Sequence, residues 1–249
     1  MADLHLRTLE KLGFAWDGPV RMQSAHPETY AAALERLRHL GRIYRCTCSR
    51  AEIAALGPPA GSQDEEELHY PGTCRSGTRH PERSAALRFA VPDRQIAFDD
   101  RWQGPMADNV ARSSGDFIVS RRDGITAYQL AVVVDDALQD VSDVVRGCDL
   151  IGSTARQLLL QEALGLPHPG YAHLPLLVAA DGRKLAKSRH ALGIDTHEPA
   201  AALVTALELL AQRPPRELAR ASATEVWAWA MANWNPAPFH GRRSVRVPD

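Results

Sequence analysis

Three cysteines and a neighbouring tyrosine or histidine have the residue types and spacing of a metal site. Cys46 and Cys48 are separated by one residue at the end of a predicted strand, and Cys74 follows a long loop. Thiolates arranged in this way suit tetrahedral zinc, which prefers soft sulfur ligands. Three cysteines leave one position open, which Tyr70, with its pKa lowered by the metal, or His69 could fill. Buried free cysteines explain the spacing equally well, because a single Cys-x-Cys pair is not very specific.

Two lysines three positions apart, Lys184 and Lys187, lie in the polar segment 181–188. Ammonium groups on such a loop could bind a polyphosphate and stabilise the charge that develops as pyrophosphate leaves. A turn rich in lysine and arginine is more often a solvated loop, so the spacing alone favours the structural explanation.

A third group of polar residues surrounds an apolar run. Residues 130–134 are predicted to form a buried strand that ends in Asp135 and Asp136. A pocket at the carboxyl end of such a strand could bind a small polar ligand. Arg146 could bind a carboxylate through two hydrogen bonds, and Tyr128 could orient the ligand through its hydroxyl. The aspartates could equally end a strand or cap a helix, so these residues alone do not establish a site.

The elements that must position these groups alternate between helices and strands, which predicts an α/β fold. Leucines at helical spacing predict one helix that Gly13 ends and a second that Gly41 ends. A third helix is predicted over 153–164, ended by Gly165, and a helical region over 198–234. Strands are predicted at 20–23, 43–48, 86–91, 96–100, 117–120, 130–134 and 174–178.

Composition excludes several classes of protein. Apolar residues at 45% and charged residues at 24% are near the globular average, and no run of eighteen apolar residues exists. The first residues lack the apolar core of a secretory signal, so a cytoplasmic protein without a membrane partner is expected. A net charge of −1 means that any RNA contact would use local basic clusters. Four cysteines in a reducing compartment argue against a disulfide framework, and Cys148 is interpreted as a small packing residue.

Taken together and in this order, the three groups resemble the glutamyl-tRNA synthetase family of class I aminoacyl-tRNA synthetases. The Lys-Leu-Ala-Lys-Ser loop is similar to the family's KMSKS signature, with alanine where serine is usual. The resemblance implies that Lys187 contacts ATP and that Lys184 assists at the phosphates. Residues 23–30, and the run 116–147 with its Tyr-x-Leu-Ala and Val-Arg-Gly elements, resemble the family's glutamate-binding region. Tyr128 and Arg146 are therefore expected to contact glutamate.

Within that family the chain most resembles the glutamyl-Q tRNA(Asp) synthetases, short paralogues that attach glutamate to queuosine in the anticodon of tRNA(Asp). Their zinc motif, Cys-x-Cys followed by Tyr-x-x-x-Cys, is matched by Cys46, Cys48, Tyr70 and Cys74. The resemblance thus implies a structural Zn²⁺ held by these four residues. Only about sixty residues follow the lysine loop, which is too few for the anticodon-binding domain of a full-length glutamyl-tRNA synthetase.

The implied fold is an N-terminally truncated, Rossmann-like α/β catalytic domain of a class I synthetase. It carries a zinc-binding insertion and a small helical C-terminal region. The family's HIGH-type motif and its Arg-Ile-Glu-Asp-type strand are not matched, so the complete protein is expected to begin upstream of Met1. The expected division is 1–48 and 111–195 for the two parts of the catalytic domain, 49–110 for the insertion and 196–249 for the helical region.

The implied reaction has two steps, and the first needs no tRNA. ATP, with Mg²⁺, and L-glutamate form glutamyl-adenylate and pyrophosphate, and the glutamyl group then passes to queuosine of tRNA(Asp). Two alternatives stay open: a fragment of a conventional glutamyl-tRNA synthetase, and a non-catalytic, zinc-stabilised tRNA-binding module. The sequence does not determine the oligomeric state, for which a monomer is the expectation.

Overall fold

The computed structural model describes residues 2–56, 68–179 and 197–247, and the chain forms two compact units. The larger, here called the central unit, comprises Arg21–Arg101 and Pro105–Ala172. The smaller, here called the terminal unit, comprises Met1–Val20, Trp102–Gly104 and His173–Asp249. The domain division expected from the sequence stays a prediction.

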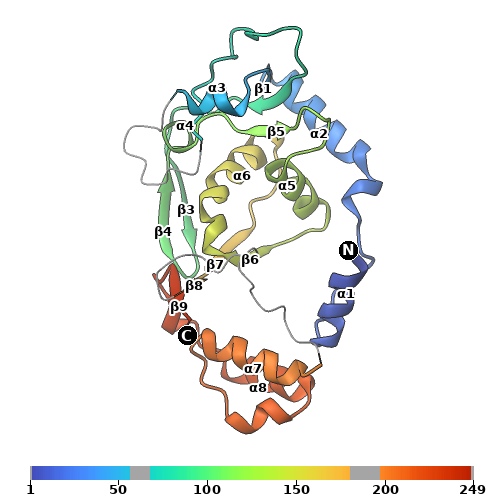
Figure 1. Cartoon of the computed structure of the whole chain (residues 1–249), viewed down its shortest axis with the longest axis vertical. Coiled ribbons are helices and arrows are strands. Elements are labelled where there is room, and N and C mark those ends of the chain that lie inside the picture. Colours follow the sequence, from blue (N-terminus) through green and yellow to red (C-terminus); the bar gives the residue numbers. More distant parts are fainter. Residues whose placement is uncertain (1, 57–67, 180–196, 248–249) are drawn as a thin grey trace. The chain divides into compact units, whose positions relative to one another are not determined.

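Two sheets form the framework of the central unit (Figure 1). Their strands are β1 (Ile43–Cys46), β2 (Ala86–Phe89), β3 (Ile96–Asp100), β4 (Gly104–Asp108), β5 (Ile118–Ser120), β6 (Asp143–Gly147) and β7 (Gly170–Leu174). The first sheet has the order β1-β2-β5 with antiparallel neighbours. The second has the order β4-β3-β7-β6, in which β3 and β7 are parallel. Because β1 ends at Cys46, the first sheet fixes the position of the first predicted metal ligand.

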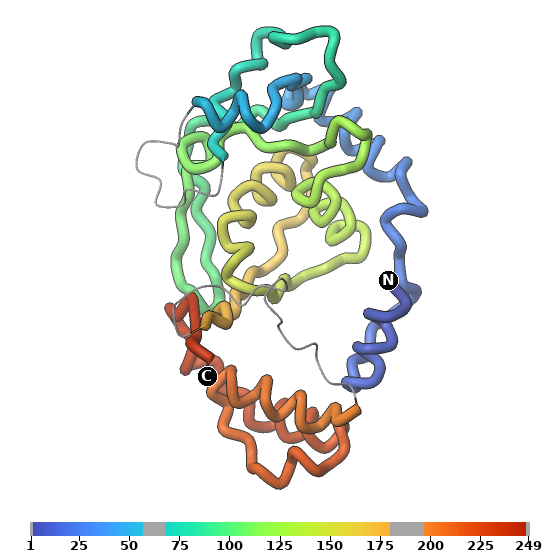
Figure 2. Tube along the Cα trace, viewed as in Figure 1, coloured from blue at the N-terminus to red at the C-terminus, as the bar shows by residue number. Residues whose placement is uncertain are grey.

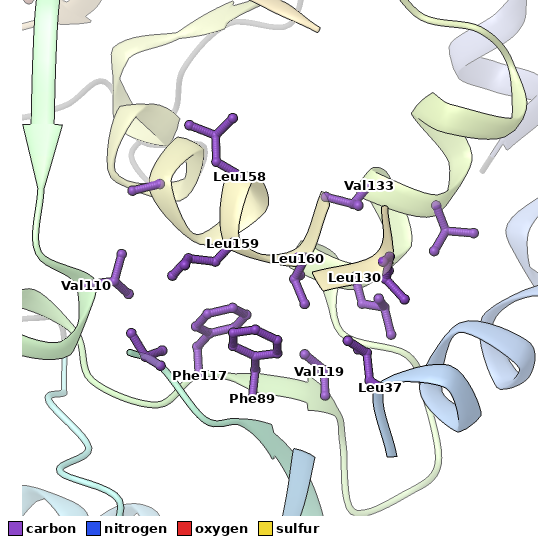
Figure 3. Packing of buried hydrophobic residues seen from close by; sticks show 14 of the residues in the cluster. Leu37, Phe89, Val110, Phe117, Val119, Leu130, Val133, Leu158, Leu159 and Leu160 are labelled. Atoms are coloured by element: carbon purple, nitrogen blue, oxygen red, sulfur yellow. The ribbon is translucent and has the colours of Figure 1, made fainter. Parts of the chain in front are cut away.

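The helices of the central unit pack against these sheets around one apolar core. They are α2 (Pro27–His39), α3 (Arg50–Ala54), α4 (Val110–Ser113), α5 (Tyr128–Leu138) and α6 (Ile151–Leu164), with short 3-10 turns at Gln23–Ala25 and Cys148–Leu150. Leu158, Leu159 and Leu160 are consecutive in α6 and all buried, as in a helix that its neighbours cover on several sides (Figure 3). Phe89 and Phe117 stack beneath it with ring centroids 5.4 Å apart. Each such buried side chain contributes about 1.5–3 kcal/mol to stability.

The predicted strand at 130–134 is wrong, because these residues lie in α5. The buried residues Leu130, Ala131, Val133 and Val134 follow helical spacing and face the core. The β-branched run favoured a strand by propensity, but packing against α2 and α6 decided the conformation. The strand predicted at 20–23 is also absent, since residues 20–22 are irregular and a 3-10 turn follows.

The terminal unit is small and largely helical. Its elements are α1 (Ala2–Lys11), β8 (Leu176–Val178), α7 (Pro199–Leu209), α8 (Ala223–Asn233) and β9 (Ser244–Arg246), with 3-10 turns at Arg216–Arg220 and Ala237–Phe239. Figure 2 traces α7 and α8, coloured orange, which pack against each other through an apolar core that includes Val204 and Val226. The indole of Trp227 in α8 donates to the carbonyl of Leu12, 2.8 Å away. The predicted helical region over 198–234 is confirmed, as are the helices ended by Gly13, Gly41 and Gly165.

None of the helices in the described parts of the chain combines the length and the apolar composition needed to cross a lipid bilayer.

One close backbone approach ties the long loop after β1 to the core. The amide of Asp116 donates to the carbonyl oxygen of Tyr70 at 2.9 Å, and the amide of Tyr70 donates to Ser114 at 3.0 Å. Gly115 between them has φ of 70°, and a Cβ atom there would lie 2.0 Å from the carbonyl oxygen of Tyr70. Only glycine therefore fits this position.

We expect Gly115→Ala to lower the free energy of unfolding by more than about 3 kcal/mol, since the backbone must move as well as adopt a strained conformation. Gly124→Ala is the matched control, because Gly124 has φ of 84° but a Cβ atom there would have no neighbouring atom within 4 Å. Its cost is about 1–2 kcal/mol, from the left-handed conformation alone. Denaturant unfolding of both variants measures the difference, and equal losses would contradict the packing argument.

Candidate functional site

The three cysteines predicted as metal ligands come together in the central unit. The Sγ atoms of Cys46, Cys48 and Cys74 all lie within 4.8 Å of one another. Cys48 and Cys74 have their Sγ atoms 3.5 Å apart, and no disulfide links the three. Cys46 and Cys74 are almost completely buried, as metal-binding thiolates are when the protein shields them from solvent. We call the segment 46–48 the hook.

The side chain that completes this cluster is Tyr70, not His69. The Tyr70 hydroxyl lies 3.3 Å from Sγ of Cys46 and 3.6 Å from Sγ of Cys48, and it accepts from the amide of Cys74 at 3.0 Å. The ring of His69 instead contacts the carbonyl oxygen of Ala111, with Nε2 3.0 Å away. Three sulfur atoms and one phenol oxygen therefore converge on one point, a donor set that fits tetrahedral zinc.

The protonation states within the cluster are set by burial and hydrogen bonding. Burial raises the pKa of the Cys74 thiol, but hydrogen bonds from the Tyr70 hydroxyl and from the backbone of Thr47 and Arg79 outweigh it and lower the pKa to about 6. Burial also raises the pKa of the Tyr70 phenol, as do its hydrogen bonds to the cysteines. The guanidinium of Arg88, with Cζ 3.9 Å from the Tyr70 ring centroid, provides a cation against the aromatic face. The cluster thus supplies a thiolate at neutral pH, the form that binds metals.

A buried carboxylate anchors the loop that carries Cys74. Asp116 is only 1% exposed and forms an ion pair with Arg75, Nη2 to Oδ1 2.5 Å. The same carboxylate accepts from the Tyr44 hydroxyl at 2.5 Å and from the amide of Val91 at 2.8 Å. Because Arg75 follows Cys74 directly, this network fixes the third cysteine relative to the first sheet.

The structure also joins the hook to the turn that precedes α5. Nη2 of Arg122 lies 2.9 Å from the carbonyl oxygen of Thr47 and 2.5 Å from that of Cys48. The sequence alone assigned no role to Arg122 or Asp116. The position of Asp116 between a glycine and an apolar strand is a weak signal of a buried carboxylate. No spacing connects Arg122 to Cys48, which is 74 residues away.

The two residues expected to contact glutamate lie near the start of α5 and on β6. Tyr128 is the first residue of α5 and is 46% exposed. Arg146 donates to Oγ1 of Thr154 at 3.0 Å, and its Cζ lies 5.4 Å from the ring centroid of Tyr171. Burial raises the pKa of Tyr171, although the hydrogen bond from Gln161 opposes the shift. Arg146 therefore lies between Thr154 and the Tyr171 ring.

The two adjacent aspartates have different surroundings within α5. Asp135 is buried and accepts from Nε2 of Gln23 at 2.7 Å and from the Tyr30 hydroxyl at 2.8 Å. Burial and this hydrogen bond raise the pKa of Tyr30 to about 12. Asp135 thus ties α5 to α2 and the turn before it, so the two segments that resemble a glutamate-binding region are in direct contact. Asp136 is partly buried, and burial raises its pKa although Arg146 opposes the shift.

A cleft of about 700 Å³ runs from the hook to the start of α5. Its lining includes Cys46, Cys48, Tyr128 and Gln129. The charged residues that line it are Arg50, Arg88, Arg121, Arg122, Arg156, Asp116 and Asp123. Five arginines against two aspartates make this cleft basic in a chain whose net charge is −1. Lys184 and Lys187 lie outside the described residues.

Comparison with known proteins identifies the class of protein. Residues 2–216 match the family model described as tRNA synthetases class I (E and Q), catalytic domain. The fold is similar to the crystal structure of a glutamate-tRNA synthetase from Elizabethkingia anophelis, with a TM-score of 0.72 and 20% identity. That match covers 99% of this chain and 58% of the other, so the chain spans less than two thirds of that synthetase. The chain has the catalytic-domain fold of class I synthetases.

Closer relatives define the particular family. The chain is 48% identical to a glutamyl-Q tRNA(Asp) synthetase of Pseudomonas aeruginosa PAO1, over 92% of this chain and 75% of the relative. Proteins with the same name from Aromatoleum aromaticum and Geobacter sulfurreducens are 49% and 45% identical, over 92% and 96% of this chain and 71% and 80% of the relatives. The chain therefore belongs to the glutamyl-Q tRNA(Asp) synthetase family of class I aminoacyl-tRNA synthetases.

The raised pKa of Asp136 makes stability depend on pH. Burial favours the protonated carboxyl of Asp136. Its contribution to the stability of the folded protein is therefore present below the usual pKa of about 3.9, and it is lost as the pH rises through the raised pKa of the folded state. We expect Asp136→Asn to have a higher Tm than the wild type at pH 7, and this gain to shrink below about pH 4. The exposed Asp140→Asn is the control for the change in net charge. A gain in the Asp136 variant that persists unchanged at acid pH would contradict the assignment.

Proposed function

We propose that this protein activates L-glutamate with ATP and transfers the glutamyl group to queuosine in the anticodon of tRNA(Asp). The observation that carries the proposal is the 48% identity to a glutamyl-Q tRNA(Asp) synthetase over 92% of the chain. The Cys-x-Cys and Tyr-x-x-x-Cys elements of this chain, whose side chains converge in space, support it.

The proposed first step joins glutamate to AMP. A carboxylate oxygen of glutamate attacks the α-phosphorus of ATP, and pyrophosphate leaves with the electron pair of the broken P–O bond. Tyr128 and Arg146 orient the amino acid, the arginine through a bidentate contact with a carboxylate. Lys187 contacts ATP, and Lys184, with Mg²⁺, balances the charge that develops on the phosphates. Catalysis is mainly positioning and charge stabilisation.

In the proposed second step, a hydroxyl of queuosine attacks the acyl carbon of glutamyl-adenylate. The new ester bond forms as the acyl–phosphate bond breaks and AMP leaves. The basic cleft beside Tyr128 supports an RNA partner, because arginines at 50, 121, 122 and 156 offer cations to a phosphodiester backbone. The chain has a net charge of −1, so an RNA contact would depend on a local cluster of positive charge such as this cleft.

Cys46, Cys48, Tyr70 and Cys74 are the proposed holders of a structural Zn²⁺. When bound, it would crosslink the hook to the loop that carries Cys74 and so stabilise this region. Arg88 would complement the negative charge of three thiolates and a phenolate around the metal.

Tyr70→Phe should weaken zinc binding by about tenfold or more, because it removes the fourth donor and keeps the ring beside Arg88. Competition with a chromogenic zinc chelator measures the affinity. His69→Ala is the control, since its ring contacts Ala111 and not the cysteines. Wild-type affinity in the tyrosine variant, or a loss in the histidine variant, would show that the fourth ligand is misassigned.

The proposed function is tested by incubating the full-length protein, including any segment encoded upstream of Met1, with ATP, radiolabelled L-glutamate and purified tRNAs. We expect label on tRNA(Asp) that carries queuosine and none on the same tRNA with guanine at that position. Pyrophosphate exchange should proceed without tRNA. Arg146→Lys should raise KM for glutamate about tenfold or more, because an ammonium cannot make the bidentate contact.

Two results would overturn the proposal. Charging of tRNA(Glu) instead of tRNA(Asp) would indicate a conventional glutamyl-tRNA synthetase activity. Binding of tRNA without any ATP-dependent step would indicate a non-catalytic, zinc-stabilised binding module.

A further inference from the structure

The side chain of Arg122 contacts main-chain atoms of the hook. Its Nη2 donates to the carbonyl oxygens of Thr47 and Cys48, the residues between and at the predicted metal ligands. Carbonyl acceptors belong to the backbone, so these hydrogen bonds depend on where the hook lies and not on its side chains. No carboxylate in the described parts of the chain forms an ion pair with Arg122. Its charge is therefore available to complement an anionic metal–thiolate centre.

The turn that carries Arg122 is closed by several hydrogen bonds. The amide of Arg121 donates to the carbonyl of Ile125 at 2.8 Å, and the amide of Gly124 donates back to Arg121 at 3.1 Å. The side chain of Asp123 accepts from the amide of Ile125 at 3.1 Å and pairs with Arg121 at 2.9 Å. A turn closed in this way moves as one piece.

The end of this turn determines where α5 begins. The amide of Ala127 donates to the carbonyl of Val119 at 3.0 Å, and Ala127 is the N-cap residue of α5. Tyr128 follows directly, and it lines the same cleft as Cys48 and Arg122. One guanidinium and one hydrogen-bonded turn therefore connect the hook to the first residue of α5.

We propose that Arg122 is a positioning residue that couples metal occupancy of the hook to the placement of Tyr128. When the metal fixes the hook, the carbonyls of Thr47 and Cys48 are held in place and Arg122 holds the turn and the start of α5 against them. Without the metal the hook is free to move, and the turn loses this restraint. The consequence for glutamate binding rests on the proposed function, whereas the coupling itself does not.

Hydrogen exchange of the full chain, followed by mass spectrometry with and without Zn²⁺, tests the coupling. In the wild type we expect zinc to slow exchange about tenfold in peptides covering both the hook and residues 121–130. In Arg122→Gln zinc should protect the hook but not residues 121–130. Arg121→Gln is the matched control, because it removes a neighbouring arginine that pairs with Asp123 and not with the hook. That ion pair is exposed and adds little to a turn that backbone hydrogen bonds close, so this variant should behave as the wild type.

Two outcomes overturn the proposal: equal zinc protection of residues 121–130 in Arg122→Gln, or no zinc effect on them in the wild type. If Arg122→Gln loses protection throughout the central unit, Arg122→Met replaces it in the same comparison, with the same two outcomes overturning the proposal. Arg122→Met keeps an unbranched stem of similar length and removes the nitrogen that donates to both carbonyls, so the zinc effect should fall at 121–130 and remain at the hook.

Glutamate-dependent pyrophosphate exchange gives a second readout. Arg122→Gln should raise KM for glutamate about fivefold or more and leave KM for ATP unchanged, because Tyr128 is assigned to the amino acid. An equal rise in both constants would contradict a role through Tyr128. If the full-length wild type shows no pyrophosphate exchange, the proposed function fails, while hydrogen exchange still decides whether the hook and the turn are coupled.

Discussion

The buried carboxylate of Asp116 is the interaction on which the arrangement of the central unit depends. A charge at 1% exposure is tolerated because a guanidinium, a phenol and a backbone amide all donate to it. Arg75 belongs to the loop after β1, Tyr44 to β1 itself and Val91 to the segment after β2. One carboxylate thus holds together the elements that deliver the cysteines. Without this carboxylate, the guanidinium, the phenol and the amide would all lose the acceptor that they share.

Helix α5 connects this loop-rich region with the apolar core. Its inner face packs on α2 and α6, which fixes its axis, and its first turn lines the basic cleft. The buried Asp135 sets the position of α2 through Gln23 and Tyr30. A single helix therefore carries both a structural carboxylate and a candidate ligand contact. Asp135 faces α2 and the turn before it, whereas Asp136, next in the helix, lies near Arg146, so the two adjacent aspartates have different surroundings.

The order of motifs in the sequence was sufficient to predict the class of fold and the family, and the family resemblance, not spacing alone, predicted the four candidate metal ligands. Periodicity failed at 130–134, where three consecutive valines favour a strand and only long-range packing makes a helix. Spacing left the choice between Tyr70 and His69 open, and the family resemblance favoured Tyr70. The structure adds the geometric reason, since the Tyr70 hydroxyl faces the cysteines and the His69 ring contacts Ala111. The contact of Arg122 with Cys48 joins residues 74 positions apart, and no local sequence pattern predicts it.

The hydrogen bond between Trp227 and Leu12 has a consequence for how the chain folds during synthesis. Helix α1 contains no buried residue of its own, and its end is held by an indole that the ribosome makes more than two hundred residues later. The central unit ends at Ala172, so its residues are made before those of α7 and α8. During synthesis from the N-terminus, the central unit can therefore fold before α7 and α8 are made, and α1 can pack against α8 only afterwards.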